Sequence, residues 1–483
     1  MNENVISVKK VCAVLLGVYT LFAVAFCLIA QYQMKYTAEE TVFVGENADS
    51  NVGELLDGTR VVQTFSPDLK YLRGMNIRFS TFARENTGKL DISLINVDTD
   101  EALWKTQLDV NELEDNSWLE LRFDEPVIIE EGSDTKLGVS IDVQGSTQGR
   151  AVTIGCQQAG VPTKDSLTIN GEIVDNAGLC LSTIQNSDSK YAPFYIPLLA
   201  LGLALLAAYC GWLIAAEKKG RRSLGLKLIQ TVNRYNFLLK QLISRDFKTK
   251  YKRSVLGVFW SFLNPLLTML VQYAVFSRLF KFDIKNYPVY LLTGIVFFNN
   301  FNDSTNQAMM AIVGNSQLIT KVYVPKYIYP ISKVLSTSIN LLLSLIPLVL
   351  VALVTGVKLS PALIMLPVGI LLLLLFTIGI AFAVSAAMVF FRDIQFLWGV
   401  FIMIWMYATP IIYPIEILKG SFMYPMQKLN PMYHYITFFR TIIIDGVSPE
   451  PSAYLICGAL AVLSLLIGGL IFKKTQDKFV LYI

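Results

Sequence analysis

Long apolar runs alternate with polar stretches over most of the chain, and eight of them are long enough to be considered as membrane spans. A helix needs about 20 apolar residues to cross the hydrocarbon core of a bilayer. The runs are Val11–Ala30, Phe194–Ala216, Val255–Phe280, Tyr287–Ile312, Ile331–Val357, Ala362–Phe391, Phe396–Tyr413 and Ala453–Phe472. The pattern predicts a polytopic α-helical membrane protein with about eight spans.

The fourth run is the most polar of the eight, because it contains Asn299, Asn300, Asn302 and Asp303. Polar groups at membrane depth are costly unless they face protein or water. We therefore expect this helix to pack internally or to line a cavity.

Between the first two runs, residues Thr41–Gln185 alternate apolar and polar positions with the period of β-strands. The expected strands are Tyr71–Phe79, Lys89–Val97, Trp118–Phe123, Lys136–Val143 and Ala151–Cys156. Turn signals such as Asn86-Thr87-Gly88 separate them. Short strands at this spacing predict an antiparallel β-sandwich inserted into the helical protein, and their rhythm resembles jelly-roll galactose-binding-like modules.

A third pattern covers residues Ser223–Arg253. Apolar residues recur there at helical spacing, while lysines and arginines crowd the opposite side, which is typical of an amphipathic helix in the cytoplasmic membrane interface. A solvated basic linker is the alternative. The basic face includes Arg245, Lys248 and Lys250.

The distribution of basic residues predicts the sidedness of the chain. Lys9 and Lys10 precede the first run, and the cluster Lys218–Arg222 follows the second. Cytoplasmic loops are enriched in such residues, so we expect a multi-pass protein of the cytoplasmic membrane with both termini in the cytoplasm and residues 32–192 outside. A cleaved signal peptide is the alternative for the first run, which continues well past the candidate site at Ala23-Val24-Ala25.

These patterns divide the chain into five parts. We expect a cytoplasmic tip with an anchor (1–31), an extracytoplasmic β-sandwich (32–192), a second transmembrane helix with its basic cluster (193–222), the amphipathic helix (223–253) and a six-span core (254–483).

Composition agrees with two differently solvated parts. The chain has 483 residues, of which 53% are hydrophobic and only 16% charged, against about 25% charged in soluble proteins. Gln31–Lys190 holds 27 acidic and 13 basic residues, a net charge of −14, whereas the remainder carries +18. This composition excludes an ordinary cytosolic protein.

Several catalytic classes are disfavoured as well. The single histidine, His434, makes a histidine-built zinc site or a Ser-His-Asp triad unexpected. No G-x-x-x-x-G-K-[ST] loop occurs, so the chain does not hydrolyse ATP by the P-loop route. We therefore expect a protein that is not an enzyme, with no catalytic residues, no metal site, no cofactor of its own and no nucleic-acid partner.

In the β region, aromatic and cysteine residues are the candidate functional groups. Tyr71, Trp104 and Trp118 are candidate sugar-stacking platforms, although core packing is the commoner role of an aromatic residue on a strand. Cys156 and Cys180 would lie in an oxidising compartment, where a pair can form a disulfide. The sequence leaves a disulfide and two free thiols equally open, because it does not give their distance.

The segment Arg245-Asp246-Phe247-Lys248-Thr249-Lys250-Tyr251-Lys252-Arg253-Ser254-Val255-Leu256-Gly257-Val258-Phe259-Trp260, continuing to Asn264-Pro265-Leu266, closely resembles the opening of permeases of type-2 ABC exporters for O-antigen, teichoic acid and related polysaccharides. The resemblance continues through Phe391-Arg392-Asp393-Ile394, Ala408–Tyr413 and Leu429-Asn430-Pro431-Met432. It covers roughly Leu224–Ile483. The anchor, the outer domain and the second span are additions to the pattern of the family.

The resemblance implies a six-span core that dimerises around a pathway and works with two separate subunits that bind ATP and Mg. It implies that the amphipathic helix, with Arg245, Lys248, Lys250 and Tyr251, acts as a cytoplasmic gate. The loop Asn315–Tyr329 would contact the ATPase through Gln317, Lys321, Tyr323, Pro325 and Lys326; a plain connector is the alternative. Candidate residues of the translocation path are Phe259, Trp260, Phe262, Trp398, Trp405 and Tyr407, for which core or interface packing is equally expected.

The expected function is therefore the membrane subunit of an ATP-driven exporter of a cell-surface polysaccharide, carried as a lipid-linked glycan. A type-2 ABC permease for lipid or drug efflux is the alternative within the same architecture. A membrane-anchored sugar sensor is the alternative outside transport.

Overall fold

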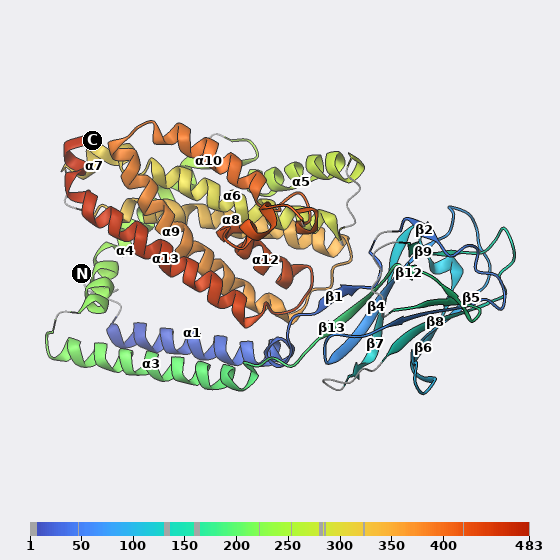
Figure 1. Cartoon of the computed structure of the whole chain (residues 1–483). Helices are drawn as coiled ribbons and strands as arrows, with labels where there is room; N and C mark the ends of the chain where they lie inside the picture. Colours follow the sequence, from blue (N-terminus) through green and yellow to red (C-terminus); the bar gives the residue numbers. More distant parts are fainter. Residues whose placement is uncertain are drawn as a thin grey trace. The chain divides into compact units, whose positions relative to one another are not determined.

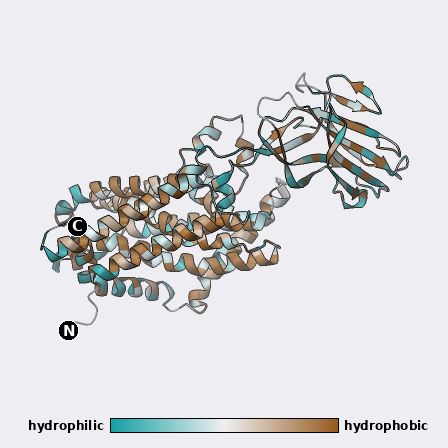
Figure 2. Ribbon diagram, turned by 90° about the horizontal axis from the view of Figure 1, so that it is seen from below, coloured by the Kyte–Doolittle hydropathy of each residue, from teal (hydrophilic) through white to brown (hydrophobic). Residues whose placement is uncertain are grey.

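The computed structural model describes residues 7–46, 48–129, 136–158, 165–221, 223–252, 254–279, 284, 286–321, 324–418 and 420–482. The chain divides into two compact units, a β domain (Met34–Pro193) and a helical domain (Met1–Gln33 and Phe194–Ile483). Colouring by hydropathy distinguishes them, since the long helices are largely hydrophobic and the strands mix both kinds of residue (Figure 2).

The helices are α1 (Val8–Ile29), α2 (Gln31–Lys35), α3 (Ala192–Lys218), α4 (Leu224–Tyr251), α5 (Trp260–Leu279), α6 (Tyr287–Met309), α7 (Ser316–Lys321), α8 (Ile328–Val354), α9 (Leu366–Phe390), α10 (Ile394–Ala408), α11 (Met423–Gln427), α12 (Pro431–Ile443), α13 (Pro451–Thr475) and α14 (Phe479–Tyr482). Within the described residues, six helical segments are long and apolar enough to cross a membrane; they contain α1, α3, α5, α8, α9 and α13. A polytopic helical membrane protein with an inserted β domain is thus confirmed.

The two other expected spans differ from the prediction. α6 is a 23-residue helix whose polar residues keep it below the hydropathy of the other six. α10 has only 15 residues, fewer than the roughly 20 that a perpendicular span needs. It ends at Ala408, just before Thr409-Pro410, where the backbone leaves the helical conformation because a proline disfavours helix in the residue before it.

α9 and α13 form the closest helix pair and lie side by side (Figure 1). Their backbones meet at Gly379 and Gly468: a Cβ added to Gly468 would lie 1.8 Å from the Gly379 carbonyl oxygen. Ser464 adds a hydrogen bond from its Oγ to the Phe376 carbonyl, 3.1 Å away. Small residues permit such close contact between membrane helices, so the backbones of α9 and α13 pack directly against each other.

The amphipathic helix α4 packs its C-terminal half against the helical domain. Leu242 is 4% exposed and belongs to a cluster with residues of α7, α8, α9, α13 and α14. Towards its N-terminal end, Leu228 and Val232 are 65% and 56% exposed. Leu226, however, is 5% exposed and packs against residues of α1 and α3. The apolar stripe therefore contacts protein near both ends, while Leu228 and Val232 remain open, as expected of a helix in a membrane interface.

The β domain is a sandwich of two sheets. Its strands are β1 (Glu40–Phe43), β2 (Ser50–Asn51), β3 (Arg60–Phe65), β4 (Tyr71–Ser80), β5 (Lys89–Asn96), β6 (Glu101–Asp109), β7 (Ser117–Ile128), β8 (Leu137–Gln144), β9 (Thr153–Gln157), β10 (Leu167–Ile169), β11 (Glu172–Val174), β12 (Gly178–Leu179) and β13 (Leu181–Asn186). One sheet has the order β1-β13-β4-β9-β12, with β2 paired to β9 and β7 to β4; the other has the order β11-β10-β3-β8-β5-β6.

All strand pairs of the β domain are antiparallel, and their inward side chains form one apolar core. Ile77 and Phe79 of β4, Ile92 of β5 and Ile141 of β8 are almost completely buried in it. The five strands expected from the sequence are present as β4, β5, β7, β8 and β9. The period-2 alternation therefore identified strands of both sheets, but not β3 or the nine-residue β6.

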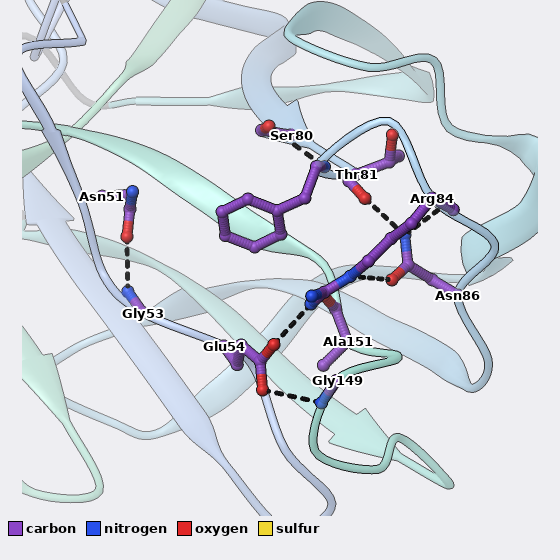
Figure 3. A network of polar contacts seen from close by, with 10 residues as sticks. Asn51, Gly53, Glu54, Ser80, Thr81, Arg84, Asn86, Gly149 and Ala151 are labelled. Carbon is purple, nitrogen blue, oxygen red and sulfur yellow. Dashed lines mark hydrogen bonds and ion pairs between the residues drawn. The ribbon is translucent and has the colours of Figure 1, made fainter.

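A loop network closes one end of the sandwich (Figure 3). The Glu54 carboxylate accepts hydrogen bonds from the Gly149 amide and the Arg84 guanidinium, which together hold its pKa below the ordinary value. Arg84 also donates to the Ala151 carbonyl, 2.9 Å away. Phe82 and Ala83 both have positive φ in this loop, a conformation that costs energy for residues other than glycine. The surrounding polar contacts hold the loop in place.

Candidate functional site

A cavity of about 430 Å³ opens in the helical domain between the C-terminal end of α4, the start of α5, and α6 and α8. This polar cavity is lined by Lys250, Tyr251, Trp260, Ser261, Asn264, Pro265, Val296, Asn299, Asn300, Asp303, Thr337, Asn340, Leu341 and Ser344. Amide, hydroxyl and charged groups dominate its wall. Polar groups of this kind within membrane helices mark substrate paths more often than packing positions.

The polar residues of α6 contribute one wall. Asn299, Asn300 and Asp303 line the cavity, as expected for a polar run that must face protein or water. Asn302 does not; its Oδ1 accepts a hydrogen bond from Asn306 Nδ2, 2.6 Å away. α6 therefore presents polar side chains to the cavity, whereas Asn302 is hydrogen-bonded within the helix.

α8 contributes a second polar wall, which was not identified from the sequence. Thr337, Asn340 and Ser344 follow one another at intervals of three and four residues and therefore share a face of the helix. This stripe of polar side chains at helical spacing is a signal that could have been found in the sequence. Asn300 Nδ2 donates to the Thr337 carbonyl, 3.3 Å away, whereas Asn300 Oδ1 is buried without a partner among the described residues. That oxygen is available to a ligand or a water molecule.

Tyr251 connects the end of α4 to the cavity wall. Its hydroxyl donates to Asn340 Oδ1, 2.7 Å away, and bonds the Ser261 hydroxyl at the start of α5. Ser344 Oγ donates to the Ser261 carbonyl, 3.1 Å away. The end of the expected gate helix is thus fixed to both α5 and α8 at the cavity.

The basic residues of α4 have different surroundings. Arg245 contacts Asp246 at 3.1 Å and donates to Asn315 Oδ1 at 3.3 Å. Lys333 at the start of α8 forms an ion pair with Asp246, at 2.8 Å. Lys248 is exposed, and Lys250 lines the polar cavity. Arg245 therefore belongs to an ion network, while Lys248 and Lys250 carry charges that can meet an anionic group.

The expected coupling segment contains the short helix α7. Gln317 and Lys321 are exposed, and Ile319 is packed in the cluster that holds Leu242. Pro325 is half-buried; Tyr323 lies outside the described residues. Lys326 Nζ donates to the Gln476 carbonyl, 2.5 Å away, so this side chain holds the C-terminal segment. Gln317 and Lys321 are the side chains of this set that can reach a partner.

Of the six candidate path aromatics, Trp260 lines the polar cavity. Phe259 and Phe262 stack on each other with ring centroids 5.1 Å apart. Trp398 donates to Thr305 Oγ1 (3.3 Å) and Trp405 to Asn430 Oδ1 (2.8 Å), and Tyr407 is 60% exposed. The structure therefore places Trp260 next to the end of α4, while the two tryptophans of α10 pack and hydrogen-bond within the helical domain.

The motifs after α10 are joined by hydrogen bonds that the sequence did not predict. Asn430 accepts from Trp405 and donates to Thr409 Oγ1, 2.9 Å away. Arg440, 8% exposed, donates to the carbonyls of Pro410 and Ile411 at 2.8 and 3.1 Å. Buried backbone groups outside a helix need such partners. These residues position the bend after α10.

The candidate residues of the β domain have separate positions. Trp104 on β6 packs against the core beside Phe123, with ring centroids 4.8 Å apart. The Tyr71 hydroxyl bonds Asp188 at 3.0 Å. Trp118 is the second residue of β7 and lies on the outward face of its sheet, opposite Arg78. The three residues therefore do not form one site.

Cys156 and Cys180 are free thiols. Cys156 pairs with Leu179 across β9 and β12, so Cys180, one residue further, leaves the opposite face of the sheet. Burial raises the pKa of Cys180 to about 11. The register explains why the structure has no bond between these two residues. Among the described residues, no group of three or more His, Cys, Asp or Glu could hold a metal ion.

Comparison with known proteins shows which family the helical part of the chain resembles. Residues 238–444 match the model of the ABC-2 type transporter family. The chain is 29% identical over 255 residues to the O-antigen export system permease protein RfbA of Myxococcus xanthus, which covers 53% of this chain and 98% of that protein. It is 28% identical over 243 residues to the protein of the same name from Klebsiella pneumoniae, covering 50% and 93%.

A more distant relative is the polysialic acid transport protein KpsM of Escherichia coli, 20% identical over 244 residues, or 50% of this chain and 93% of that protein. Most of the length of each of these relatives corresponds to about half of this chain. The β domain lies outside the region matched by the family model. Residues 238–444 therefore form an ABC-2 type transporter region that is similar to polysaccharide-export permeases, and the N-terminal β domain lies outside it.

Proposed function

We propose that this chain is the membrane subunit of an ATP-driven exporter that moves a lipid-linked polysaccharide across the cytoplasmic membrane. The polar cavity at the end of α4 is the observation that carries this proposal. Its amide and hydroxyl groups match the donors and acceptors of sugar hydroxyls. The relatives, which are O-antigen and polysialic acid export proteins, support a glycan over a lipid or drug as cargo.

The entry step follows from the surroundings of α4. Lys250 at the cavity and Lys248 on the exposed face attract the negative charge of a phosphate-linked lipid carrier. Trp260 then offers a flat apolar ring to the first sugar, and Asn299 and Asn340 offer amide groups. In this proposal α4 controls access, because the hydrogen bond of Tyr251 with Asn340 closes one side of the cavity.

The permease would work as a homodimer with two ATP-binding subunits, which supply the nucleotide and Mg. Exposed apolar side chains on α10, including Phe396, Val400 and Ile404, offer a face for a second copy or for lipid. Exposed Gln317 and Lys321 on α7 offer the contact to the ATPase. With Gln317 and Lys321 on the cytoplasmic side, both termini are cytoplasmic and residues 32–192 are extracytoplasmic.

The test compares two asparagines of the same helix. Asn299→Leu removes an amide from the cavity, whereas Asn306→Leu changes a residue of α6 that does not line it. At equal expression, we expect the first variant to lower surface glycan about tenfold, the effect of one lost hydrogen bond of about 1.4 kcal/mol. The Asn306→Leu variant should export normally. Normal export by Asn299→Leu would contradict a glycan path through this cavity.

A further inference from the structure

A second cavity, of about 340 Å³, lies in the β domain on the seven-stranded sheet. Its lining includes Asp49, Arg78, Ser80, Asp115, Asn116 and Thr153. We call it the sheet-face cavity. Its volume is at the lower end of the range of small-ligand sites, about 300–1,000 Å³, and suits a small part of a polymer.

The register of the sheet shows which side this cavity occupies. Phe79 of β4 pairs with Ile154 of β9, and both belong to the core between the sheets. Their neighbours Ser80 and Thr153 form the next pair and therefore leave the opposite face. The sheet-face cavity is thus on the outer surface of the sandwich and is not a packing defect of its core.

Several polar groups in the sheet-face cavity have no protein partner. Thr153 is 1% exposed, and its hydroxyl has no hydrogen-bond partner among the described residues. Leaving such a hydroxyl unpaired is costly, so buried polar groups are nearly always satisfied by protein, water or a ligand. Arg78 donates from Nε to Asn116 Oδ1 at 3.1 Å. Its two terminal nitrogens have no hydrogen-bond partner within the part of the chain described.

Asp115 is the acidic group whose geometry is fixed. Its Oδ1 accepts from Ser80 Oγ at 2.9 Å and from the Thr81 amide at 2.7 Å. The hydrogen bond from Ser80 is the main reason that the pKa of Asp115 is lowered. The carboxylate is therefore ionised at neutral pH and can accept hydrogen bonds.

One tryptophan is the cross-strand neighbour of a lining residue, although it does not itself line the cavity. Trp118 of β7 lies directly opposite Arg78 in the register, so both side chains leave the outer face. Trp118 is not part of the core, and its ring meets Phe43 edge-on with centroids 5.9 Å apart. Trp104, in contrast, packs against the core from the other sheet. Trp118 is thus the tryptophan that combines an outward position with a neighbouring polar cavity.

We propose that the sheet-face cavity binds an uncharged sugar residue, with Trp118 as the stacking surface and Arg78, Asp115 and Thr153 as hydrogen-bonding groups. Sugar rings present C–H faces to an aromatic plane and hydroxyls to donors and acceptors at their edges. The sheet-face cavity has two carboxylates and one guanidinium, and the region Gln31–Lys190 has a net charge of −14. These charges disfavour an anionic ligand. The expected source, a segment of the exported polymer, rests on the proposed function.

The experiment uses the full-length chain in lipid nanodiscs, without nucleotide. The probes are short oligosaccharides made from the surface polysaccharide of the source cells, separated into uncharged and anionic fractions by anion exchange. Saturation-transfer NMR and tryptophan fluorescence measure binding. We expect the uncharged fraction to bind with a Kd on the order of 1 mM.

Two pairs of variants locate the site. Trp118→Leu and Thr153→Val should each weaken binding about tenfold, as expected for one lost interaction. Trp104→Leu and Thr106→Val, both on β6 of the other sheet, should bind as the parent does. Thr153→Val replaces an unpaired hydroxyl by a methyl group of the same shape, so its melting temperature should not fall, which separates ligand contact from a structural role.

Three results would overturn the proposal: no binding by either fraction, binding by the anionic fraction alone, or equal weakening by the β6 variants. Export is measured separately with the Asn299 and Asn306 variants. Normal export without oligosaccharide binding would refute this inference and leave the proposed transport function standing. Oligosaccharide binding without export would refute the proposed transport function and leave sugar binding by the sheet-face cavity standing.

Discussion

Removing one carboxylate, by Asp246→Asn, should loosen α4 from the helical domain. Asp246 contacts Lys333 of α8 at 2.8 Å and Arg245 of its own helix at 3.1 Å, while Arg245 also reaches Asn315 before α7. The carboxylate therefore links α4 to α8, and Arg245 extends the contact to the residue before α7. Without it, two cations face each other with no compensating charge.

The expected loss of stability depends on how far the side chains of the ion pair are exposed to solvent. The side chains of Asp246 and Lys333 are 10% and 21% exposed, whereas that of Arg245 is 48% exposed. Breaking a fully buried ion pair costs about 3–5 kcal/mol, while an exposed pair contributes about 0–1 kcal/mol. The Asp246–Lys333 contact lies between these limits. We expect the docking of α4 to weaken by about 1–3 kcal/mol.

Amide hydrogen exchange in nanodiscs measures this opening directly. A loss of about 1–3 kcal/mol should speed exchange in residues 236–251 by about 5–150-fold. Lys248→Gln, a change at an exposed position of the same helix, is the matched control and should alter exchange little. The double variant Asp246→Asn with Lys333→Gln should be less destabilised than the sum of the single variants.

Equal exchange in Asp246→Asn and in the control would refute the ion network as the contact that holds α4. Additive effects in the double variant would refute the pairing of Asp246 with Lys333 specifically. In cells, a loosened α4 should reduce surface glycan at equal expression.

Two further predictions concern stability. Gly468→Val should lower the melting temperature of the helical domain by overpacking the contact with Gly379, at a cost of about 1–3 kcal/mol. Gly469→Val should be tolerated, because a Cβ added there would meet nothing within 4 Å. An equal loss of stability in both variants would contradict the close approach of α9 and α13. In the β domain, hydrogen bonds hold the pKa values of Glu54, Asp109, Asp115 and Asp188 below normal. Carboxyls with lowered folded-state pKa values stabilise the fold above their unfolded values of about 4 and lose this effect as the pH falls through the folded values, so the thermal stability of the domain should drop below about pH 4. Glu54→Gln should reduce this acid sensitivity more than Glu172→Gln does at an exposed position of β11; an unchanged pH profile would contradict the role of the Glu54 contacts.

The elements predicted correctly from the sequence are those whose apolar residues follow a regular period. Apolar length identified the long helices, and alternation identified β4, β5, β7, β8 and β9, because both patterns follow from burial of one face or of a whole element. β3 and β6 were missed for reasons that the structure shows. Gln63 is buried within β3, where its Oε1 accepts from the Leu179 amide at 2.9 Å, and β6 begins with three exposed residues at the edge of its sheet.

The composition of the polar cavity could be predicted only in part. The asparagines of α6 and the basic residues of α4 stand out in the sequence, but their meeting with Asn340 and Ser261 depends on how four helices pack. The tryptophans of α10 show the same limit. Trp405 and Asn430 are 25 residues apart, and their hydrogen bond follows from the bend at Thr409-Pro410, which hydropathy does not report.

The central claim is tested most directly by reconstitution. The permease and its ATP-binding subunit would be placed together in proteoliposomes with the lipid-linked glycan of the source cells, and movement of the glycan across the bilayer would be followed after addition of ATP and Mg. The account predicts ATP-dependent movement that needs both subunits and is about tenfold slower with Asn299→Leu but normal with Asn306→Leu. ATP-dependent movement of a hydrophobic dye or lipid, with no movement of the glycan, would contradict it.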